Sequence, residues 1–366
     1  MKPNIIFIAS TITDSHCKNR IEQFIQQGYK VHVYSFRRDK ETTPENLPYK
    51  IQVIGEIVSS NYLKRLTIYF RGIKKVVSLY KKEKNILYYA FGLDLAMFLR
   101  LFVQKQQYLY EEADLVQTYH SNKIVTKLLN CIDRKIISDS LHTILTSEGY
   151  LQYHFPNGAY PKNVTIVPNK LNPAILNYSA KKSKTDMTHL RFAFVGGARF
   201  DSIDHFVEVF LENFPQHEFH FYGPVEPRMN RFAEKYENVF YHGRFKNPDD
   251  LADIYGNIDI LLCAYDYRYA NVRYAEPNKL YEAIYFQRPI IVSKDTYLSK
   301  KVDQLNIGYT IDPFDDESIT TFVQNLTLDT LKIKQGVCTS ISQEDCILND
   351  TTLFQKLSKI KFTNNI

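Results

Sequence analysis

A short stretch in the second half of the chain, residues 275–283, combines residue types that suit a phosphorylated ligand. Pro277 is tolerated in the first turn of a helix, and the helical spacing of the apolar residues after it predicts that a helix begins there. Free N–H groups and the positive end of the helix dipole attract phosphate. Lys279 adds a cation, and the Glu282 carboxylate suits hydroxyl groups. The stretch therefore predicts a site for a ligand that carries phosphate and hydroxyl groups.

The composition limits the classes of protein to consider. A chain of 366 residues with 44% apolar residues fits two domains of moderate size. The net charge of +6 allows an anionic partner, but nucleic acid, an acidic lipid surface and a phosphorylated small molecule would all fit. The five cysteines are scattered, which indicates neither a disulfide framework nor a zinc cluster and favours a reducing cytoplasm. The sequence predicts no signal peptide. Its longest apolar run, residues 95–103, is too short for a membrane span of ~20 residues.

The first half of the chain alternates strand-length and helix-length segments. The expected strands are 4–9, 30–36, 51–57, 85–89, 108–111, 142–147 and 164–168. The expected helices are 19–27, 63–82, 94–103 with Asp94 as N-cap, and 121–137. This alternation predicts a parallel sheet covered by helices on both faces.

Residues 172–188 break the alternation and predict a linker. A second alternation follows, with expected strands at 191–195, 218–222, 239–241, 258–263, 289–292 and 309–311. Expected helices are 203–214, 228–236, 248–255, the helix that begins at Pro277, and helices from 316 onward. The predicted fold class is α/β, with two doubly wound Rossmann-like domains that face across a cleft, at residues 1–172 and 173–347. A C-terminal helix at about 348–366 is expected to pack back on the first domain. Ligands of such sheets bind beyond the carboxyl ends of the strands.

Several short motifs occur in a characteristic order along the chain. In the second half they are FVGGAR at 194–199, FYGP at 221–224, VFYHG at 239–243, LADIY at 251–255, DILL at 259–262, PNKLYEA at 277–283, RPII at 288–291, NIGY at 306–309 and DP at 312–313. Weaker matches in the first half are Asp14 with Arg20, GYKV at 28–31, TSEG at 146–149 and IVPN at 166–169. Over nearly the whole chain, this order resembles the GT-B glycosyltransferases of family four, many of which build bacterial surface polysaccharides.

The resemblance implies transfer of a sugar from a nucleotide diphosphate sugar, with retention of anomeric configuration. The family's Glu that accepts hydrogen bonds from ribose matches Glu282, and Arg199 and Lys279 would bind the diphosphate. These three residues are the predicted catalytic set. Further predicted donor contacts are Gly197, Glu276, Pro277, Asn278 and Leu280.

Three departures from the family pattern affect these assignments. The first Glu of the family's paired carboxylates touches the donor sugar, but its position holds Tyr274 here; Glu276, two residues later, is the predicted substitute. The Lys that usually follows the first Arg is replaced by residues 203–204, so Lys279 is assigned as the second cation. The Gly-rich turn after the first strand is replaced by residues 10–13. The resemblance thus assigns nucleotide contacts and leaves the sugar contacts open.

The predicted chemistry needs neither a metal nor a cofactor beyond the donor. Loss of a nucleoside diphosphate requires stabilisation of negative charge, which cations and helix N-termini supply. The chain has no Asp-x-Asp pair, P-loop, Gly-x-Gly-x-x-Gly, His-Glu-x-x-His or Gly-x-Ser-x-Gly motif, which argues against several other enzyme classes. On the acceptor side, the first domain offers four candidates that would face the cleft: Ser10, Asp14, His16 and Asp114.

Residues 61–84 predict a basic amphipathic helix. Tyr69, Ile73 and Val76 follow helical spacing, and eight lysines and arginines accompany them almost without acidic residues. Such a helix can lie on an anionic membrane, or its apolar side can pack on the sheet and leave the charges solvated. The basic stretch contains no recognised nucleic-acid motif, so a nucleic-acid partner is not predicted.

The leading hypothesis is a metal-independent glycosyltransferase, hexosyltransferase-like, that acts on a growing glycan or lipid-linked acceptor in the cytoplasm, peripherally on the inner face of the membrane. Two alternatives stay open. A nucleotide-sugar epimerase of the same fold would convert a free nucleotide sugar. A non-catalytic glycan- or nucleotide-binding partner of a transferase would fit the loss of the first Glu.

Overall fold

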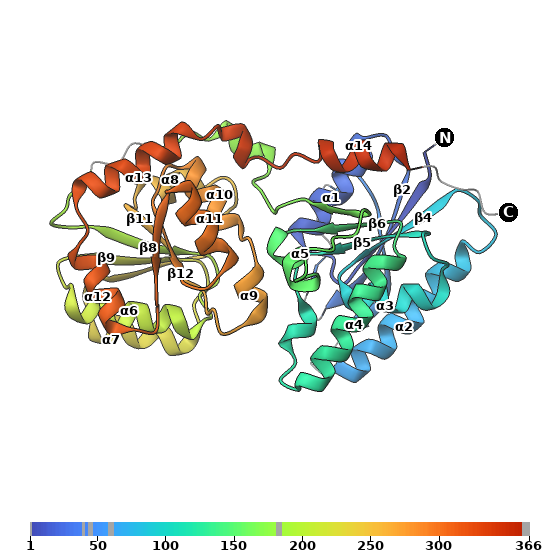
Figure 1. The fold of residues 1–366 in the computed structure, drawn as a ribbon, viewed down its shortest axis with the longest axis horizontal. Helices are drawn as coiled ribbons and strands as arrows, with labels where there is room; N and C mark the ends of the chain where they lie inside the picture. The colour runs from blue at the N-terminus through green and yellow to red at the C-terminus, as the bar shows by residue number, and fades with distance from the viewer. Residues whose placement is uncertain (1, 39–40, 43–46, 58–61, 181–184, 361–366) are drawn as a thin grey trace. The chain divides into compact units, whose positions relative to one another are not determined.

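The computed structural model describes residues 2–38, 41–42, 47–57, 62–180 and 185–360. The chain forms two compact units: unit 1 contains Met1–Pro168 and Asn349–Ile366, and unit 2 contains Asn169–Leu348. Each unit is built on its own parallel sheet with helices on both faces (Figure 1). The predicted fold class is confirmed. None of the helices in the described ranges combines the length and hydropathy needed to cross a bilayer.

The sheet of unit 1 has the strand order β3-β2-β1-β4-β5-β6-β7, and all its pairs are parallel. Its strands are β1 (Asn4–Ala9), β2 (Val31–Arg38), β3 (Ile51–Ile57), β4 (Ile86–Phe91), β5 (Tyr108–Glu112), β6 (His142–Leu145) and β7 (Val164–Ile166). Its helices are α1 (Ser15–Gln26), α2 (Tyr62–Leu79), α3 (Leu93–Phe102), the 3-10 turn η1 (Val116–Tyr119), α4 (Lys123–Asp139), α5 (Glu148–His154) and α14 (Thr351–Lys359). α1 and α14 lie on one side of the sheet and α2, α3 and α4 on the other (Figure 1).

Two local predictions for unit 1 are wrong. Asp94 lies in the first turn of α3, and the N-cap is Gly92, whose φ of 86° suits glycine. The sixth strand ends at Leu145, because Ser147 caps the unpredicted helix α5 by accepting a hydrogen bond from the Gly149 N–H at 3.0 Å.

Helix α2 packs its apolar side into unit 1. Tyr69, Ile73, Val76 and Tyr80 are buried, and α2 contacts both α3 and β3. The exposed surface of the segment carries the cations Lys64, Arg71, Lys74, Lys75, Lys81, Lys82 and Lys84. Asn61 lies outside the described residues. The apolar side therefore belongs to the domain core, and the basic side remains for other interactions.

The sheet of unit 2 has the order β10-β9-β8-β11-β12-β13, again parallel throughout. Its strands are β8 (Arg191–Val195), β9 (Glu218–Tyr222), β10 (Val239–Gly243), β11 (Ile260–Cys263), β12 (Ile290–Ser293) and β13 (Gly308–Ile311). Its helical elements are η2 (Pro173–Asn177), α6 (Asp201–Asn213), η3 (Pro227–Asn230), α7 (Arg231–Lys235), α8 (Leu251–Gly256), α9 (Ala270–Tyr274), α10 (Asn278–Tyr285), α11 (Tyr297–Leu305), α12 (Asp316–Gln324), α13 (Leu328–Ser340) and η4 (Gln343–Cys346).

Alternate residues of the unit 2 strands enter two different cores. Phe192 and Phe194 of β8 pack with residues of α6, α7 and α12, whereas Ala193 and Val195 pack with residues of α8, α10 and α11. In both units the first strand lies between the second strand and a later one, so the chain leaves the sheet in opposite directions on its two sides. This switch in direction opens a crevice at the carboxyl ends of β1 and β4, and of β8 and β11.

Candidate functional site

The loop after β8 is held close to two other segments of unit 2. Gly223 has a φ of 122°, and a Cβ there would lie 2.2 Å from the Gly196 carbonyl oxygen. Gly196 has a φ of 132°, and a Cβ there would lie 3.8 Å from Cε of Lys279. Only glycine suits such backbone at such spacing. The carboxyl end of β8 and the first turn of α10 therefore meet.

Lys279 and Glu282 form a buried pair on α10. The Lys279 Nζ lies 2.5 Å from Oε2 of Glu282, and their side chains are 13% and 2% exposed. The buried Tyr255 hydroxyl donates to the same oxygen at 2.5 Å. Because an ammonium group has three donors, Lys279 can bind a phosphate oxygen without leaving Glu282. These contacts thus fix both side chains before a ligand arrives.

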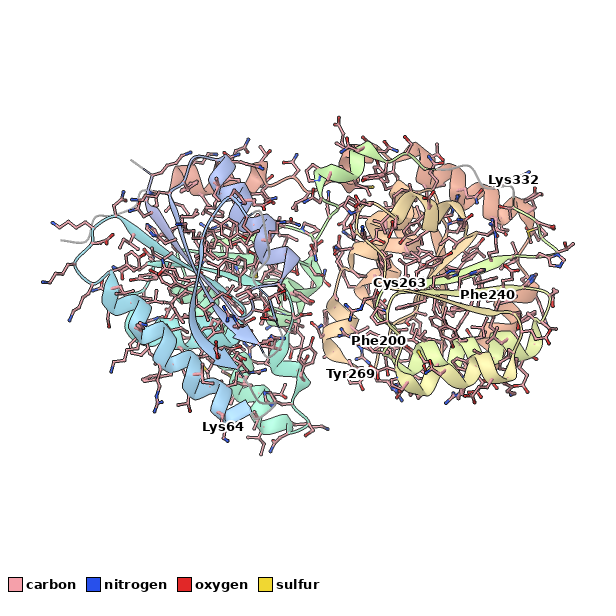
Figure 2. All side chains as sticks on the ribbon, turned by 180° about the vertical axis from the view of Figure 1, so that it is seen from behind. Lys64, Phe200, Phe240, Cys263, Tyr269 and Lys332 are labelled. Atoms are coloured by element: carbon pink, nitrogen blue, oxygen red, sulfur yellow. The ribbon has the colours of Figure 1, made fainter. Side chains whose placement is uncertain are left out.

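Arg199 is the exposed cation of the β8 loop. Its guanidinium lies over the Phe200 ring, 5.3 Å from the centroid, and its carbonyl accepts a hydrogen bond from Arg228 at 3.1 Å. Phe200 contacts the rings of Tyr265 and Tyr269, and Figure 2 shows Phe200 beside Tyr269. The aromatic group supports Arg199 at the carboxyl end of the sheet, where an anionic ligand would meet it.

Glu276 is buried and already engaged. Its Oε1 lies 2.7 Å from Nζ of Lys301 and accepts a hydrogen bond from the Tyr281 hydroxyl. Its Oε2 is buried and has no hydrogen-bond partner among the described residues. Tyr274, which occupies the position of the family's first Glu, is half-buried at the end of α9. Glu276 thus keeps one oxygen unpaired inside the protein, and Lys301 balances its charge.

The remaining predicted donor contacts have different environments. Pro277 is the N-cap of α10, and Asn278 is its first residue. The helix therefore begins one position later than predicted, since Pro277 was expected in its first turn. Leu280 is 1% exposed and its side chain belongs to the core. Gly197 is exposed, and a Cβ there would lie 3.9 Å from Cγ of Pro224.

The four acceptor-side candidates line one cavity in unit 1, of about 530 Å³. Ser10 follows β1, His16 is in the first turn of α1, and Asp114 follows β5. Asp14 caps α1 by accepting from the N–H groups of His16 and Cys17 at 2.8 and 3.3 Å, which gives its side chain a structural task. The structure thus brings all four to the carboxyl edge of the unit 1 sheet.

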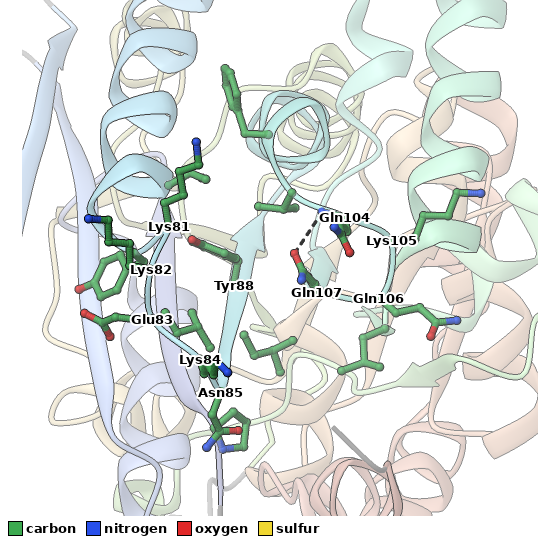
Figure 3. Close-up of a pocket in the computed structure, with 18 of the residues that line it drawn as sticks. Lys81, Lys82, Glu83, Lys84, Asn85, Tyr88, Gln104, Lys105, Gln106 and Gln107 are labelled. Carbon is green, nitrogen blue, oxygen red and sulfur yellow. Dashed lines mark hydrogen bonds between the residues drawn. The ribbon is translucent and has the colours of Figure 1, made fainter. Parts of the chain in front are cut away.

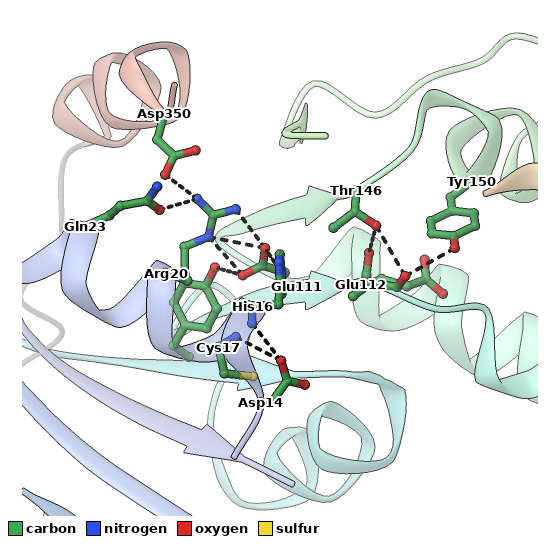
Figure 4. Close-up of polar contacts among 12 residues, drawn as sticks. Asp14, His16, Cys17, Arg20, Gln23, Glu111, Glu112, Thr146, Tyr150 and Asp350 are labelled. Atoms are coloured by element: carbon green, nitrogen blue, oxygen red, sulfur yellow. Dashed lines mark hydrogen bonds and ion pairs between the residues drawn. The ribbon is translucent and has the colours of Figure 1, made fainter. Parts of the chain in front are cut away.

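Glu111 connects this cavity with the interior of unit 1 (Figure 4). Its Oε1 lies 2.8 Å from Nε2 of His16, and Arg20 donates to both its oxygens at 2.9–3.2 Å. Arg20 also lies 2.6 Å from Oδ2 of Asp350, at the start of α14. Burial alone would raise the pKa of Glu111, but Arg20 and His16 outweigh it and hold that pKa well below the ordinary value. The carboxylate is therefore ionised and fixes the His16 ring.

Glu111 is a site residue that the sequence interpretation did not single out. The available signal is a pair of glutamates at the carboxyl end of an expected strand, since charged residues rarely end a buried strand without a partner. The cavity also contains Arg38 and Arg65, whose positions follow from β2 and α2.

A second cavity of unit 1 lies at the opposite, amino-terminal edge of the same sheet (Figure 3). The segments before β4 and β5 line it with lysine and amide side chains. They include Lys81, Lys82, Lys84, Lys105, Gln104, Gln106 and Gln107. Because ligands of doubly wound sheets bind at the carboxyl edge, we do not assign the acceptor to this cavity.

Part of the second unit matches a known protein family. Residues 189–329 match the family model described as glycosyl transferases group 1. The segment contains Arg199, Lys279 and Glu282. No curated protein sequence matches the chain significantly.

Solved structures of low sequence identity share the fold of the whole chain. The sucrose-phosphate synthase of Thermosynechococcus elongatus is 13% identical, with a TM-score of 0.69 and coverage of 97% of this chain and 98% of that chain. Anabaena Alr3699/HepE in complex with UDP is 10% identical, with a TM-score of 0.67 and the same coverages. WaaG, a glycosyltransferase involved in lipopolysaccharide biosynthesis, is 12% identical, with a TM-score of 0.66 and coverage of 93% and 97%. The GT-B fold expected from the resemblance is confirmed.

Proposed function

Because residues 189–329 match the group 1 glycosyl transferases, we propose that this protein transfers a sugar from a nucleoside diphosphate sugar to a growing glycan or lipid-linked acceptor. The observation that carries the proposal is the meeting of the β8 loop with the first turn of α10, which places Lys279 against Gly196 and beside Glu282. This is a cationic helix start at the carboxyl edge of a parallel sheet, within the segment that matches the family.

Four of the predicted donor residues have a specific role in this proposal. The Arg199 guanidinium pairs with the diphosphate through two parallel N–H donors, and Lys279 binds a second phosphate oxygen. Tyr255 and Lys279 both donate to Oε2 of Glu282, so Oε1 accepts from the ribose hydroxyls. Glu276 is the proposed contact to the donor sugar, and because its Oε2 is buried, this contact requires the side chain to turn toward the ligand.

The proposed mechanism is stabilisation of the leaving nucleoside diphosphate. As the bond between the anomeric carbon and the phosphate oxygen breaks, negative charge grows on that oxygen, and Arg199, Lys279 and the N-terminus of α10 offset it. We propose that no metal takes part. The acceptor hydroxyl attacks on the face that the diphosphate leaves, and the departing phosphate takes its proton. The configuration at the anomeric carbon is then retained without a protein nucleophile.

On the acceptor side, we propose that His16 accepts a hydrogen bond from a hydroxyl of the acceptor that lies beside the one that attacks. When the neutral ring donates its Nε2–H to Glu111, Nδ1 is the acceptor. Glu111 and Arg20 act as positioning residues because they hold the ring in this tautomer. Ser10 and Asp114, which line the same cavity, are proposed to contact other acceptor hydroxyls.

Uridine diphosphate is the first nucleotide to test. The structures of Anabaena Alr3699/HepE include complexes with UDP and with UDP-glucose. WaaG acts in lipopolysaccharide biosynthesis, which supports surface polysaccharide as the proposed product. For this protein we propose action in the cytoplasm, with the basic side of α2 on the anionic inner face of the membrane.

The donor assignment is tested by nucleotide binding to the full chain. Affinities of UDP, GDP, ADP and CDP are measured by calorimetry for the wild type and for Arg199→Ala, Lys279→Gln and Glu282→Gln. Loss of one charge-assisted hydrogen bond should weaken the binding of the nucleotide with the highest affinity by about 10-fold or more. The matched control is Arg231→Ala, an exposed arginine of unit 2 that pairs with Glu208 at 3.0 Å. Unchanged affinity in both Arg199→Ala and Lys279→Gln would remove the assignment.

Product analysis then separates transfer from its alternatives. With the corresponding nucleotide sugar and a mixture of lipid-linked and glycan acceptors, transfer releases one nucleoside diphosphate for each sugar added. Conversion of the nucleotide sugar without an acceptor would identify an epimerase. Tight binding with neither reaction would identify a non-catalytic partner.

A further inference from the structure

Three buried acid and base side chains meet in the interior of unit 1. Glu112 ends β5, Asp133 is in the middle of α4, and His154 is the last residue of α5. Their side chains are at most 1% exposed. Nε2 of His154 lies 2.7 Å from Oε2 of Glu112 and 3.7 Å from Oδ2 of Asp133. One ligand atom from each residue lies within 4.8 Å of the other two.

The hydrogen bonds of this cluster are incomplete among the described residues. Asp133 lies beside Glu112 and the buried Tyr110 hydroxyl, but neither of its oxygens makes a well-formed hydrogen bond, and Nδ1 of His154 has no partner. A fully buried fourth side chain, Gln117 of η1, points its amide at the cluster, because its Nε2 lies 3.4 Å from Oε1 of Glu112. The Gln117 carbonyl oxygen also has no partner. Buried polar groups are normally paired, so these atoms call for a further occupant.

The charges of the cluster are also unbalanced. If both carboxyl groups ionise, two carboxylates meet one imidazole in the interior, and such buried anions are costly unless a cation pairs with them or protons neutralise them. Three oxygen donors and one nitrogen donor of this kind are ligands that Zn²⁺ and Mn²⁺ accept.

We propose that Glu112, Asp133 and His154 bind a divalent transition-metal ion, with the side-chain amide oxygen of Gln117 as the fourth ligand. The ion replaces the protons that the metal-free cluster holds, one shared between Nε2 of His154 and Oε2 of Glu112 and one on Asp133, and these protons are released to solvent. The Gln117 amide turns about its last bond so that oxygen faces the ion, a rotation that leaves its shape unchanged. With four protein ligands the site is closed, so its role is structural.

The proposed ion would fix the acceptor-side cavity. It joins β5, η1, α4 and α5, and the segment from Ala113 to Gln117 supplies several walls of the cavity that contains His16. Glu112 also follows Glu111 directly in the chain. An ion bound to Glu112 would therefore restrain the end of β5, which positions the His16 ring through Glu111.

A metal-free cluster would instead hold protons. Burial raises the pKa of Glu112 to about 7 and that of Asp133 well above its ordinary range. In that case Asp133 stays protonated, Glu112 is about half protonated near pH 7, and no ion binds. This arrangement is the outcome that the experiment must distinguish from a metal site.

The test measures metal content and thermal stability of the full chain, purified without a polyhistidine tag. Elemental analysis should find Zn or Mn close to one ion per chain. After removal of metal with a chelator, Zn²⁺ or Mn²⁺ at about 100 times its Kd should raise the midpoint of one unfolding transition by roughly 5–10 °C. Asp133→Asn should abolish both the bound metal and the rise.

The control variant separates this cluster from a surface site. His220 and His242 of unit 2 have ring nitrogens 3.0 Å apart and are the obvious place for adventitious Zn²⁺. His220→Gln with His242→Gln should leave the metal content and the temperature rise unchanged. Loss of both in this control would overturn the proposal.

A spectroscopic measurement on the wild type covers the case in which Asp133→Asn fails to fold. Co²⁺ added to the metal-free protein should give the visible absorption of a four-coordinate site, and one equivalent of Zn²⁺ should remove it. Absence of copurified metal, of stabilisation and of this absorption would show that the cluster holds protons only, and would overturn the proposal.

Discussion

His16 has a pKa set by two opposing effects. Burial alone would lower it, but the Glu111 carboxylate 2.8 Å away outweighs burial and raises the pKa above the ordinary 6.5. A histidine with a raised folded-state pKa adds stability that is complete below pH 6.5 and is lost as pH rises through the raised value. The proposed role of His16 in sugar transfer depends on pH in the opposite direction, because only the neutral ring accepts a hydrogen bond from a hydroxyl.

Transfer should therefore fall as pH falls through the raised pKa of His16, whereas nucleotide affinity should not follow the same curve. In a pH profile of kcat, the wild type should show an acidic limb above pH 6.5. His16→Asn should lower kcat by about 10–100-fold and remove that limb. The control is His142→Gln, a buried histidine of the same unit that pairs with Thr165. If His16→Asn keeps the acidic limb of the kcat profile unchanged, the limb belongs to another titrating group.

For single residues, the sequence predicted which side chains belong to a site better than it predicted the residues that they contact. Lys279 and Glu282 are three positions apart on one helix, so local spacing was enough to place them together. Glu111 meets His16 and Arg20 across 91 or more residues of chain, and Glu112 meets residues from two helices. Such contacts depend on strand order, which the alternation of elements does not specify. Glu276 could be predicted as a carboxylate near the site, but its pairing with Lys301 could not.

Helix α2 contains five lysines and arginines and no acidic residue. Its apolar side is buried in unit 1, so any contact with lipid must use the basic side and the few exposed apolar residues near it. Leu79 of α2 and Leu101 of α3 are 59% and 65% exposed. An anionic bilayer would attract the lysines over about a Debye length, and these leucines would enter the interface.

Binding to vesicles should depend on the basic side of α2. With anionic vesicles at low salt, Lys74→Glu with Lys75→Glu should weaken binding by about 30-fold or more, since each lysine contributes ~1 kcal/mol near such a surface. Lys300→Glu with Lys332→Glu changes exposed lysines of unit 2 by the same charge and should have little effect. Equal binding by all three proteins, measured by sedimentation with the vesicles, would exclude the basic side of α2 as the contact.

The amphipathic pattern alone did not settle how α2 is used. A stripe of apolar residues at helical spacing can pack on a sheet or on lipid, and both partners are equally apolar. The neighbouring helix α3 and strand β3 decide the matter here. Most other elements were predictable because buried parallel strands form short apolar runs. The short helix α5 was missed because Ser147 reads equally well as the end of the preceding strand.

At the scale of the whole molecule, unit 1 is completed by a distant part of the chain. Asp350 at the start of α14 lies 2.6 Å from Arg20, and both side chains are at most 4% exposed. Phe354 of α14 packs on Phe24 of α1, with ring centroids 5.0 Å apart. The last helix is therefore part of the unit 1 core.

Asp350→Asn should lower the stability of unit 1 alone. Removing one partner of a buried ion pair costs about 3–5 kcal/mol, and we expect roughly 1–3 kcal/mol because Arg20 keeps Glu111. By calorimetry, the best-binding nucleotide should raise the transition of unit 2, and Asp350→Asn should lower the other transition. Asp345→Asn, an exposed residue of unit 2, is the control. A loss in the nucleotide-sensitive transition would contradict this division of the chain.

The place of Asp350 in the chain also sets an order of events during synthesis. A ribosome delivers all of Asn169–Leu348 before it delivers the partner of Arg20. Unit 2 can reach its final fold while the chain is still growing, since all its strands have then emerged. Unit 1 begins first but finishes last, and until α14 emerges the α1 side of its sheet lacks Phe354 against Phe24. The first half of the protein is therefore the part most dependent on protection from aggregation before release.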